Sequence, residues 1–562
     1  MKYVIVGGVA GGASTAARLR RLDEQSEIIM FEKGPHVSFS NCCLPYRLSE
    51  MIDENEKLVL MTPEQFKNQY NINARTSCEV LSVDRNAKTV KVRDLQKNEE
   101  YEESYDKLIL APGANAIIPP VKGIEGAEIF VVKNVVDIAL LYGFLKEKNT
   151  KKVAVVGGGF IGVEVAENLT EAGYEVSMVE ALPQILKTYD YDMVQILQKE
   201  MMDKGVNLIV GDQVVEFKGS DMLLKSGKTV EAEAVVMAAG VRPDSKLARE
   251  AGLELNARGA IKVDANYCTD DPDIYAVGDA IEVFHALIHK PTMLPLAGPA
   301  QKQARAAADH IYGMPVRNTG YIGSSCIKVF DYNAASTGLT AAQCEAEGIS
   351  YDIVYVIPQD KVGLMPGSCP LHYKLVYEVP TGKVLGAQVI SKGDAAKRAD
   401  IVATLIKFGG TVDDLRDLEL CYAPPFSTAK DAGNHAGLVA GNLLQKRFRQ
   451  VRVDEVRGLV ESNAYIIDVR EAAEYAQGHI KTAVNIPLSQ IRQRMDEIPK
   501  DRPVYLHCRS SQRSYNAVLA LQGHGFHNVY NISGSFLGIC FYEYFNDVTQ
   551  KREPIVTAYN FN

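Results

Sequence analysis

Residues 157–162 read GGGFIG, and this stretch decides the fold of the chain. An apolar run over 151–156 precedes it, a helical pattern over 159–172 follows, and a second apolar run over 175–180 ends at Glu180. Strand, glycine-rich turn, helix and strand in this order predict a βαβ unit that binds a dinucleotide. The terminal acid is placed for ribose hydroxyls, and its charge favours NADH over NADPH.

The same order of elements occurs at the start of the chain. Strand patterns over 2–6 and 27–32 flank GGVAGG at residues 7–12 and the helical pattern that follows it. Val9 occupies the middle glycine position, so this copy of the fingerprint is degenerate, but Glu32 again ends the second strand. Two such units predict two dinucleotides in one chain, each with its pyrophosphate at the positive N-terminus of a helix.

Length and composition are those of a soluble protein with several domains. The chain has 562 residues, of which 46% are hydrophobic and 23% charged, and its net charge is −9. This length exceeds what one hydrophobic core usually organises. The acidic balance argues against a nucleic-acid or anionic-membrane partner. No apolar stretch is long enough for a membrane span, and the strand from Tyr3 leaves no room for a signal peptide, so we expect a cytoplasmic protein.

Three further segments point to a known family. Residues 108–114 read LILAPGA, residues 238–244 read AAGVRPD, and residues 269–279 read TDDPDIYAVGD. Together with the two glycine loops, they resemble the two-dinucleotide flavoprotein disulfide reductases in order and spacing. The resemblance implies FAD in the first site, where Asp279 would bond the ribityl chain, and NADH in the second.

The resemblance also implies the cofactor-binding residues. For FAD they are Gly7, Gly8, Ala10, Gly11, Gly12, Glu32, Asn41, Cys42, Ala111, Pro112, Gly113, Asp279 and Ala297. For NAD they are Gly157, Gly159, Phe160, Ile161, Gly162, Glu180 and Gly240. No metal is expected.

A reactive thiol is predicted beside the flavin. Residues 38–46 read SFSNCCLPY, without the paired redox cysteines of glutathione-reductase relatives. The stretch resembles the single-cysteine branch, which comprises coenzyme A-disulfide reductases, NADH oxidases and peroxidases, and persulfide reductases. Cys42 matches the catalytic cysteine, and Cys43 stands where relatives usually have Gly or Ala. A helix start at Pro45 is expected to stabilise the Cys42 thiolate and lower its pKa.

Two features separate the members of this branch. Oxidases and peroxidases carry a histidine in the first glycine loop, and Ala10 occupies that position here, which favours a sulfur substrate. Coenzyme A-disulfide reductases hold their ligand with basic residues at the end of the first helix and polar residues before the cysteine. A solvated helix end is the alternative for the basic residues. The matching candidates for a CoA-type ligand are Arg18, Arg20, Arg21, Ser38 and Asn41.

The middle of the chain resembles the dimerisation domain of the same family. Residues 421–427 read CYAPPFS, a segment that reaches the partner subunit's active site in relatives. Tyr422 and Phe426 are therefore candidates for a substrate site shared across a homodimer. Some coenzyme A-disulfide reductases carry a tyrosine pair before Pro-Gly, whereas residues 364–367 read LMPG. This departure favours persulfide reduction.

The C-terminal part resembles the rhodanese module. Residues 465–470 read YIIDVR, and the loop at 508–513 reads CRSSQR between an apolar strand pattern and a helical pattern. Such a loop surrounds the Cys508 sulfur with backbone N–H groups at a helix N-terminus, which stabilises a thiolate and then a persulfide. Asp468 and Arg470 are expected to brace the fold. The candidate substrate-binding residues of the loop are Arg509, Ser510, Ser511, Gln512 and Arg513.

The predicted fold class is α/β, with two Rossmann-like dinucleotide-binding domains for FAD and NAD, an α+β dimerisation domain and a C-terminal α/β rhodanese domain. The predicted limits are 1–115 with 245–325 for FAD, 116–244 for NAD(H), 326–440 for dimerisation and 451–562 for rhodanese.

The resemblance implies an NADH-dependent flavoprotein reductase of persulfides, polysulfides or CoA-linked disulfides, with sulfide as product and a rhodanese domain that handles sulfane sulfur. Coenzyme A itself is expected as substrate or bound cofactor, and a second copy of the chain as partner. The alternatives are a coenzyme A-disulfide reductase for thiol redox balance, an NADH oxidase or peroxidase, and a sulfur-carrier or redox-sensing protein.

Overall fold

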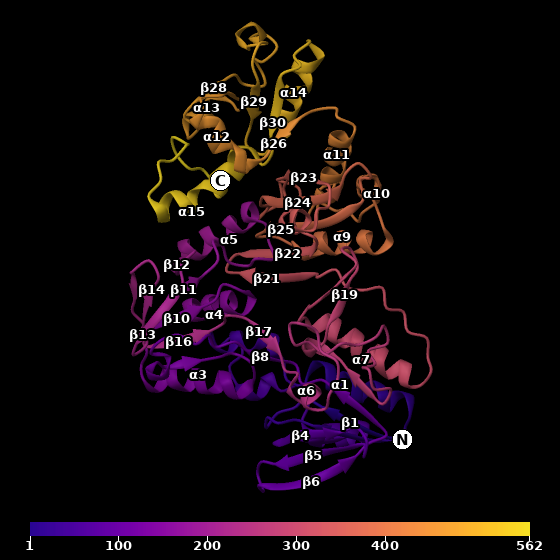
Figure 1. The fold of residues 1–562 in the computed structure, drawn as a ribbon. Coiled ribbons are helices and arrows are strands. Elements are labelled where there is room, and N and C mark those ends of the chain that lie inside the picture. The colour runs from indigo at the N-terminus through magenta and orange to yellow at the C-terminus, as the bar shows by residue number, and fades with distance from the viewer. Residues whose placement is uncertain (562) are drawn as a thin grey trace. The chain divides into compact units, whose positions relative to one another are not determined.

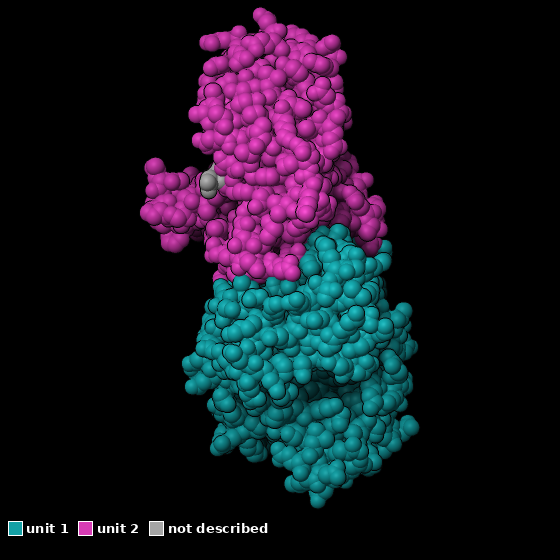
Figure 2. All heavy atoms as spheres, turned by 90° about the vertical axis from the view of Figure 1, so that its left-hand side faces the viewer, with its two compact units in different colours: residues 1–183, 209–321 teal, residues 184–208, 322–562 magenta. Residues whose placement is uncertain are grey.

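The computed structural model describes residues 1–561, which form a mixed α/β structure (Figure 1). It divides into two compact units, which Figure 2 distinguishes by colour. The first comprises Met1–Pro183 and Ile209–Tyr321, and the second comprises Gln184–Leu208 and the chain from Ile322 onward. The predicted α/β class and the four kinds of domain are confirmed, whereas the exact domain limits remain a prediction.

The first parallel sheet of the first unit has the strand order β18-β7-β1-β2-β3. The central strand is buried on both faces, and its residues Val4 and Ile5 have no solvent exposure. The hydrophobic core around this strand also includes Val80, Val90 and Val92 of a three-stranded antiparallel sheet. Helix α7 (Ala297–Ile311) packs against α1. The elements are β1 (Lys2–Val6), α1 (Ala10–Leu22), β2 (Glu27–Phe31), β3 (Asn73–Arg75), β7 (Lys107–Leu110) and β18 (Ile274–Ala276).

The second parallel sheet repeats this plan with the strand order β12-β11-β10-β16-β9. Its βαβ core is β10 (Lys152–Val156), α4 (Phe160–Glu171) and β11 (Glu175–Glu180), within one residue of the sequence pattern at each boundary. The other elements are β9 (Ile129–Phe130), α3 (Val135–Glu147), β12 (Asn207–Val210) and β16 (Ala234–Met237).

Smaller antiparallel sheets and short helices complete the first unit. The three-stranded sheets are β4 (Cys78–Asp84), β5 (Thr89–Asp94) and β6 (Glu99–Ser104), and β13 (Val214–Lys218), β14 (Asp221–Leu224) and β15 (Thr229–Val230). The two-stranded pairs are β8 (Ala114–Ala116) with β17 (Val241–Pro243), and β19 (Val283–His285) with β20 (Lys290–Thr292). The helices are α2 (Pro63–Tyr70) and α6 (Lys246–Glu250).

The second unit contains an antiparallel sheet of order β21-β22-β25-β24-β23, which is the α+β part predicted for the middle of the chain. Its strands are β21 (Ser325–Val329), β22 (Tyr332–Gly338), β23 (Tyr351–Val356), β24 (Leu371–Glu378) and β25 (Val384–Ser391). The accompanying helices are α8 (Ala341–Glu347), α9 (Ala396–Phe408), α10 (Val412–Asp417) and α11 (Ala432–Leu444).

A parallel sheet of order β26-β30-β29-β27-β28 forms the C-terminal part of the second unit. Its strands are β26 (Gln450–Val451), β27 (Tyr465–Asp468), β28 (Ala483–Asn485), β29 (Val504–His507) and β30 (Val529–Ile532). The helices are α12 (Val456–Glu461), α13 (Ala472–Ala476), α14 (Gln512–Gly523) and α15 (Ser535–Gln550).

Helix α5 (Tyr191–Asp203) belongs to the second unit, although the sequence places it inside the NAD domain. Lys374 on β24 forms ion pairs with Asp192 at 2.7 Å and Asp190 at 3.0 Å, and all three side chains are buried or nearly so. Asp190 also accepts a hydrogen bond from the backbone N–H of Ala341 at the start of α8. Buried charges must be paired, so this cluster ties α5 to the antiparallel sheet.

Candidate active sites

The backbone of the first glycine loop leaves no room for side chains at Gly7 and Gly12. Gly7 has φ of +99°, and a Cβ there would lie 2.1 Å from the carbonyl oxygen of Ala111. A Cβ on Gly12 would lie 1.8 Å from the carbonyl oxygen of Gly7. Helix α1 starts at Ala10, so its first backbone N–H groups lie at the loop and can bind a pyrophosphate.

The second glycine loop repeats this construction. Gly157 has φ of +113°, and a Cβ on Gly162 would lie 1.9 Å from the carbonyl oxygen of Gly157. A Cβ on Gly159 would meet no atom within 4 Å, so open space lies at the start of α4. This space and the N-terminus of α4 fit a dinucleotide, as the complete fingerprint predicts.

The two predicted acids, Glu32 and Glu180, accept hydrogen bonds from backbone N–H groups of their glycine loops. Glu32 accepts hydrogen bonds from the backbone N–H groups of Gly8 at 2.9 Å and Gly34 at 2.8 Å, and burial raises the pKa of Glu32. Glu180 accepts from Gly158 at 2.6 Å. Each acid therefore lies at the end of its strand beside the loop, where ribose hydroxyls are expected.

Cys42 is exposed on the short 3-10 helix η1 (Asn41–Cys43). Partial desolvation by surrounding protein atoms raises the pKa of the Cys42 thiol, and the carboxyl groups of Glu164 and Asp279 raise it further. The predicted lowering of this pKa is therefore wrong for the protein alone. The next helix, η2 (Pro45–Arg47), is a single 3-10 turn, so its dipole is too short to outweigh two carboxylates.

Glu164 is a site residue that the sequence reasoning missed. It lies on α4 beside Cys42, and burial raises the pKa of its carboxyl to about 7. Asp279 is in the same group, and burial raises its pKa while Lys133 acts in the opposite direction. Glu164 follows Phe160 by one helical turn, so the spacing places both on the same face of α4, but nothing near Glu164 in the sequence indicates that it lies beside Cys42.

The loop before Cys42 is fixed by backbone and side-chain bonds. The Asn41 side-chain N–H donates to the carbonyl oxygen of Lys133 at 2.9 Å. Ser38 adopts φ of 49°, and its backbone N–H donates to the carbonyl oxygen of Gly8 at 2.7 Å. These bonds place Ser38 beside the first glycine loop and Asn41 beside Lys133, which suits the predicted role of both residues near Cys42.

The three arginines at the end of α1 differ in their surroundings. Arg20 is buried, and its guanidinium donates to the carbonyl oxygens of Tyr70 at 2.7 Å and Asn71 at 2.9 Å. It also donates to the carbonyl oxygens of Asp23, Glu24 and Ser26. This structural role speaks against Arg20 as a phosphate ligand.

Arg18 and Arg21 remain candidates for an anionic ligand. Arg18 is mostly buried and forms an ion pair with Asp309 at 2.5 Å. Arg21 is exposed, and its guanidinium lies 6.0 Å from the centre of the Tyr70 ring. Arg21 is thus the arginine of this helix end most accessible to a phosphate group.

The segment predicted to reach a partner subunit presents apolar side chains to solvent. Tyr422 is 49% exposed, and Phe426 is 71% exposed. The backbone N–H of Val362 donates to the carbonyl oxygen of Pro424 at 3.4 Å, which holds the loop of Leu364 against this segment. Leu364 is 93% exposed. Such a group of exposed apolar residues is typical of an interface.

The rhodanese loop holds Cys508 at the bottom of a turn between β29 and α14. Cys508 is 1% exposed, and the Ser514 hydroxyl donates toward its sulfur at 3.7 Å. Ser511 adopts φ of 76° directly before α14, which begins at Gln512. Arg513 pairs with both carboxylate oxygens of Glu474 at 2.7 Å, which fixes its guanidinium. The N-terminus of α14 therefore faces the loop, as predicted.

The expected bracing role of Asp468 and Arg470 is confirmed. Both side chains are buried, and the Arg470 guanidinium donates to Asp468 at 2.6 Å and to the carbonyl oxygen of Gly478 at 2.6 Å. His507 lies 3.7 Å from Asp468, and burial lowers the pKa of this histidine. The pair stabilises the strand ends from which the Cys508 loop begins.

These features define a class of protein. Two glycine loops at helix N-termini, an exposed thiol beside the first of them and a rhodanese-type loop make up an oxidoreductase with two dinucleotides and an attached sulfur-handling module. Within residues 1–561, no group of His, Cys, Asp and Glu side chains could hold a metal ion. No helix of the same residues is long and apolar enough to cross a membrane.

The chain belongs to the pyridine nucleotide-disulphide oxidoreductase family, because the sequence model of that family matches residues 1–304. The dimerisation domain of that family matches residues 324–432, and the rhodanese-like domain matches residues 452–540. The chain is therefore an oxidoreductase that uses FAD and NADH, and the residues of both glycine loops fit these cofactors.

Three similar proteins are informative. The coenzyme A disulfide reductase of Staphylococcus aureus (strain JH9) is 34% identical over 440 residues, which are 78% of this chain and 99% of the relative. The crystal structure of reduced Bacillus anthracis CoADR-RHD has a TM-score of 0.94 and 41% identity, covering 97% of this chain and 98% of its own. The structure of an NAD-dependent persulfide reductase from A. fulgidus has a TM-score of 0.91 and 32% identity, covering 95% and 99%.

Proposed function

We propose that the chain is an NADH-dependent reductase of persulfides, polysulfides or CoA-linked disulfides, with sulfide as product. The observation that carries this proposal is the presence in one chain of the exposed Cys42 site and the Cys508 loop. The two structural relatives that cover almost the whole chain support it, since one is titled CoADR-RHD and the other a persulfide reductase. Ala10 in the first glycine loop favours a sulfur substrate over oxygen or peroxide.

Cys42 is the nucleophile of this reaction. Its exposure lets a persulfide or disulfide reach the sulfur, and Asn41 holds the short helix by its bond to Lys133. Bound FAD and NADH supply the electron pair that cleaves the sulfur–sulfur bond. Glu164, with a pKa of about 7, accepts the proton when the Cys42 thiol ionises and can return it to the product thiol.

Coenzyme A or its persulfide is the ligand class that the first unit is built to receive. Arg21 is accessible to its phosphate groups, whereas Ser38 and Asn41 are placed for the arm that carries the sulfur. Tyr422 and Phe426 of a partner subunit complete the site in a homodimer, because both are exposed on the dimerisation domain.

The rhodanese loop handles sulfane sulfur. Backbone N–H groups around Cys508 and the start of α14 favour a negatively charged persulfide sulfur. Arg513, fixed by Glu474, adds positive charge beside it. In this arrangement Cys508 would supply sulfur in a form that the Cys42 site can reduce.

Substitution of the two adjacent cysteines tests the proposal. Cys42→Ser is expected to abolish NADH oxidation with persulfide, because the nucleophile is lost, and to spare sulfur transfer by Cys508. Cys43→Ser is the matched control and should retain most of the reductase turnover. Reductase turnover that survives in Cys42→Ser would contradict the assignment of this residue.

A further inference from the structure

Residues 554–561, here called the C-terminal segment, follow α15 and fold back onto the rhodanese part of the chain. The match to the rhodanese-like domain ends at residue 540, so this segment lies outside it. Ile555 and Val556 of the segment are nevertheless buried in the same hydrophobic core as Val453, Ile466 and Phe536. The segment is therefore an integral part of this domain.

Backbone contacts hold the C-terminal segment against the chain around Gly478. The backbone N–H of Thr557 donates to the carbonyl oxygen of His479 at 2.8 Å, and the N–H of His479 donates to the Thr557 hydroxyl at 3.0 Å. Gly478 has φ of +147°, and a Cβ there would lie 2.5 Å from the carbonyl oxygen of Ala558. Glycine at this position permits the close approach of the two segments.

Aromatic side chains fix the segment further along. The Tyr559 hydroxyl donates a hydrogen bond to Asp547 on α15. The centre of the Phe561 ring lies 5.0 Å from that of Phe541, and the Lys199 ammonium lies 4.1 Å from the centre of the Phe561 ring. Contacts between aromatic rings, and between a ring and a cation, are favourable, so Phe561 has a defined position against α15 and α5.

A small cavity lies at the Cys508 loop. Its volume is about 140 Å³, and Glu474, Arg509 and Phe536 line it. The backbone N–H of Phe536 donates to the carbonyl oxygen of Cys508 at 3.0 Å, and Glu474 forms an ion pair with Arg513 of the loop at 2.7 Å. This volume is below the range of about 300–1,000 Å³ that is usual for ligand pockets, so it has room only for a small molecule.

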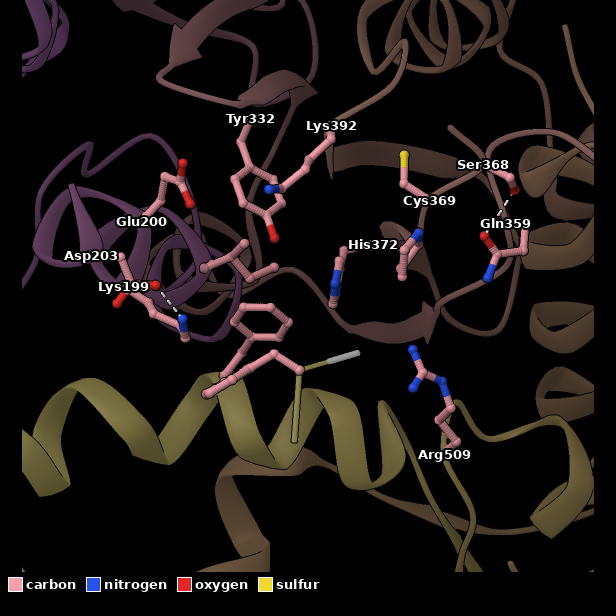
Figure 3. A pocket seen from close by; sticks show the side chains of 14 residues that line it. Lys199, Glu200, Asp203, Tyr332, Gln359, Ser368, Cys369, His372, Lys392 and Arg509 are labelled. Atoms are coloured by element: carbon pink, nitrogen blue, oxygen red, sulfur yellow. Dashed lines mark hydrogen bonds and ion pairs between the residues drawn. The ribbon is translucent and has the colours of Figure 1, made fainter. Parts of the chain in front are cut away.

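A larger cavity of about 450 Å³ meets the small one at Arg509, which lines both (Figure 3). Figure 3 shows Arg509 on one side of this larger cavity and the acids Glu200 and Asp203 on the opposite side, so charges of both signs line it. Asn560 lines the small cavity, and the next residue, Phe561, lines the larger one. The C-terminal segment and Arg509 therefore form the boundary between the two cavities.

We propose that Asn560 and Phe561 determine the donor specificity of the rhodanese site, because they restrict it to sulfur donors with a small leaving group. A small donor fits the cavity of about 140 Å³ at the loop. A bulky donor would need the space of the larger cavity, from which Asn560 and Phe561 separate it. This inference rests on the proposed function, in which Cys508 takes up sulfane sulfur.

Two thiosulfonate anions test the proposal, because they have the same charge and the same reacting group but differ in size. The Cys508 thiolate attacks the terminal sulfur of R–SO₂–S⁻, which gives a Cys508 persulfide anion and releases the sulfinate R–SO₂⁻. Added cyanide takes the outer sulfur as thiocyanate and restores the thiolate. The assay uses full-length, FAD-loaded protein with methanethiosulfonate as the small donor and benzenethiosulfonate as the bulky one, and Cys508→Ser gives the background rate.

The quantity measured is the ratio of kcat/KM for the bulky donor to that for the small donor. We expect a low ratio in the unsubstituted chain. The ratio should rise about tenfold in Phe561→Ala and in a chain that ends at Tyr559, which is the order of discrimination that side-chain bulk gives in a pocket. The rate with the small donor should stay nearly unchanged in both. Leu519→Ala, which alters an exposed residue of α14 that lines neither cavity, is the control and should keep the low ratio.

Alkylation of Cys508 tests the same access without any sulfur donor. Iodoacetamide and a bulky fluorescein maleimide are compared by peptide mass spectrometry, and the bulky reagent alone should gain in rate in the two altered chains. A high ratio in the unsubstituted chain, or an equal gain for small and bulky compounds in the altered chains, would overturn the proposal. Thermal unfolding of each protein shows that it is folded. NADH-dependent sulfide release by the unsubstituted chain is measured separately, so failure of the reductase assignment is distinguished from failure of this inference.

Discussion

The thiol of Cys42 lies among acidic neighbours that oppose its ionisation. Burial and the carboxyl groups of Glu164 and Asp279 raise its pKa, whereas a nucleophile must ionise to attack sulfur. Glu164 itself changes charge near neutrality, because its pKa is about 7. The protonation of the thiol and that of the carboxyl are therefore coupled across the pH range in which the reaction runs.

Glu164→Gln is expected to lower the apparent pKa of Cys42. Above pH 7 the Glu164 carboxyl is negative and disfavours the thiolate, and the amide removes this repulsion. The rate of Cys42 alkylation as a function of pH reports the change. Glu171→Gln, on the exposed end of the same helix, is the control and should leave the pH profile in place. An unchanged profile in Glu164→Gln would show that the two groups do not interact.

We predict that Arg20 stabilises the fold and that Arg21 binds the ligand. Arg20→Gln leaves carbonyl groups unpaired, at a cost of about 1–3 kcal/mol for each buried group in the free energy of unfolding. Arg21→Gln should leave thermal unfolding unchanged and raise KM for a CoA-linked substrate. Thermal unfolding and steady-state kinetics on both variants provide the check. A destabilised Arg21→Gln protein, or an Arg20→Gln protein of unchanged stability, would reverse the assignment.

At the scale of the element, each glycine loop with its strand and helix forms one functional unit. The loop leaves no room for side chains, the helix N-terminus lies where a pyrophosphate is expected, and the acid at the end of the second strand accepts a hydrogen bond from a loop N–H. The same construction occurs twice in the first unit. Because the two loops share this frame, we expect single side chains such as Glu180 to set the nucleotide preference.

Glu180→Ala should shift the preference from NADH toward NADPH. Its negative charge repels a 2′-phosphate, and loss of this repulsion is worth on the order of 1 kcal/mol near the protein surface. The ratio of kcat/KM for NADPH to that for NADH is expected to rise several-fold. Glu175→Ala, at the exposed beginning of the same strand, is the control. A ratio equal to that of the unsubstituted chain would show that another group selects the nucleotide.

The local elements could be predicted from sequence because their signals lie within a short stretch. The period of apolar residues and the glycine turns placed β10, α4 and β11 within one residue of their observed limits. The charge environment of Cys42 could not be predicted in this way, since Glu164 and Asp279 come from distant parts of the chain. Likewise, the position of α5 depends on Lys374, a residue far along the sequence.

At the scale of the whole molecule, one chain contains a reductase part, a dimerisation domain and a rhodanese domain. The exposed residues Leu364, Tyr422 and Phe426 lie on the dimerisation domain, and their apolar exposure supports the homodimer proposed above. A homodimer would cover these residues and place them at the partner's reductase site.

Leu364→Asp is predicted to weaken the homodimer. A carboxylate in a desolvated interface has no partner there, so dissociation becomes easier. Light scattering over a range of protein concentrations measures the oligomeric state, and NADH turnover should fall in step with dissociation. Leu60→Asp is the control, because Leu60 is exposed on the first unit. A Leu364→Asp protein that stays dimeric at all concentrations would place the interface elsewhere.

The central claim is that the chain reduces sulfur with NADH, and its most direct test is anaerobic NADH oxidation by the FAD-loaded protein. CoA persulfide, polysulfide and CoA disulfide are compared as substrates, and sulfide is assayed alongside. We predict rapid turnover with the persulfide and the polysulfide, with one sulfide released for each NADH oxidised. Absence of turnover with all three, together with rapid NADH loss once air is admitted, would contradict the account and indicate an oxidase.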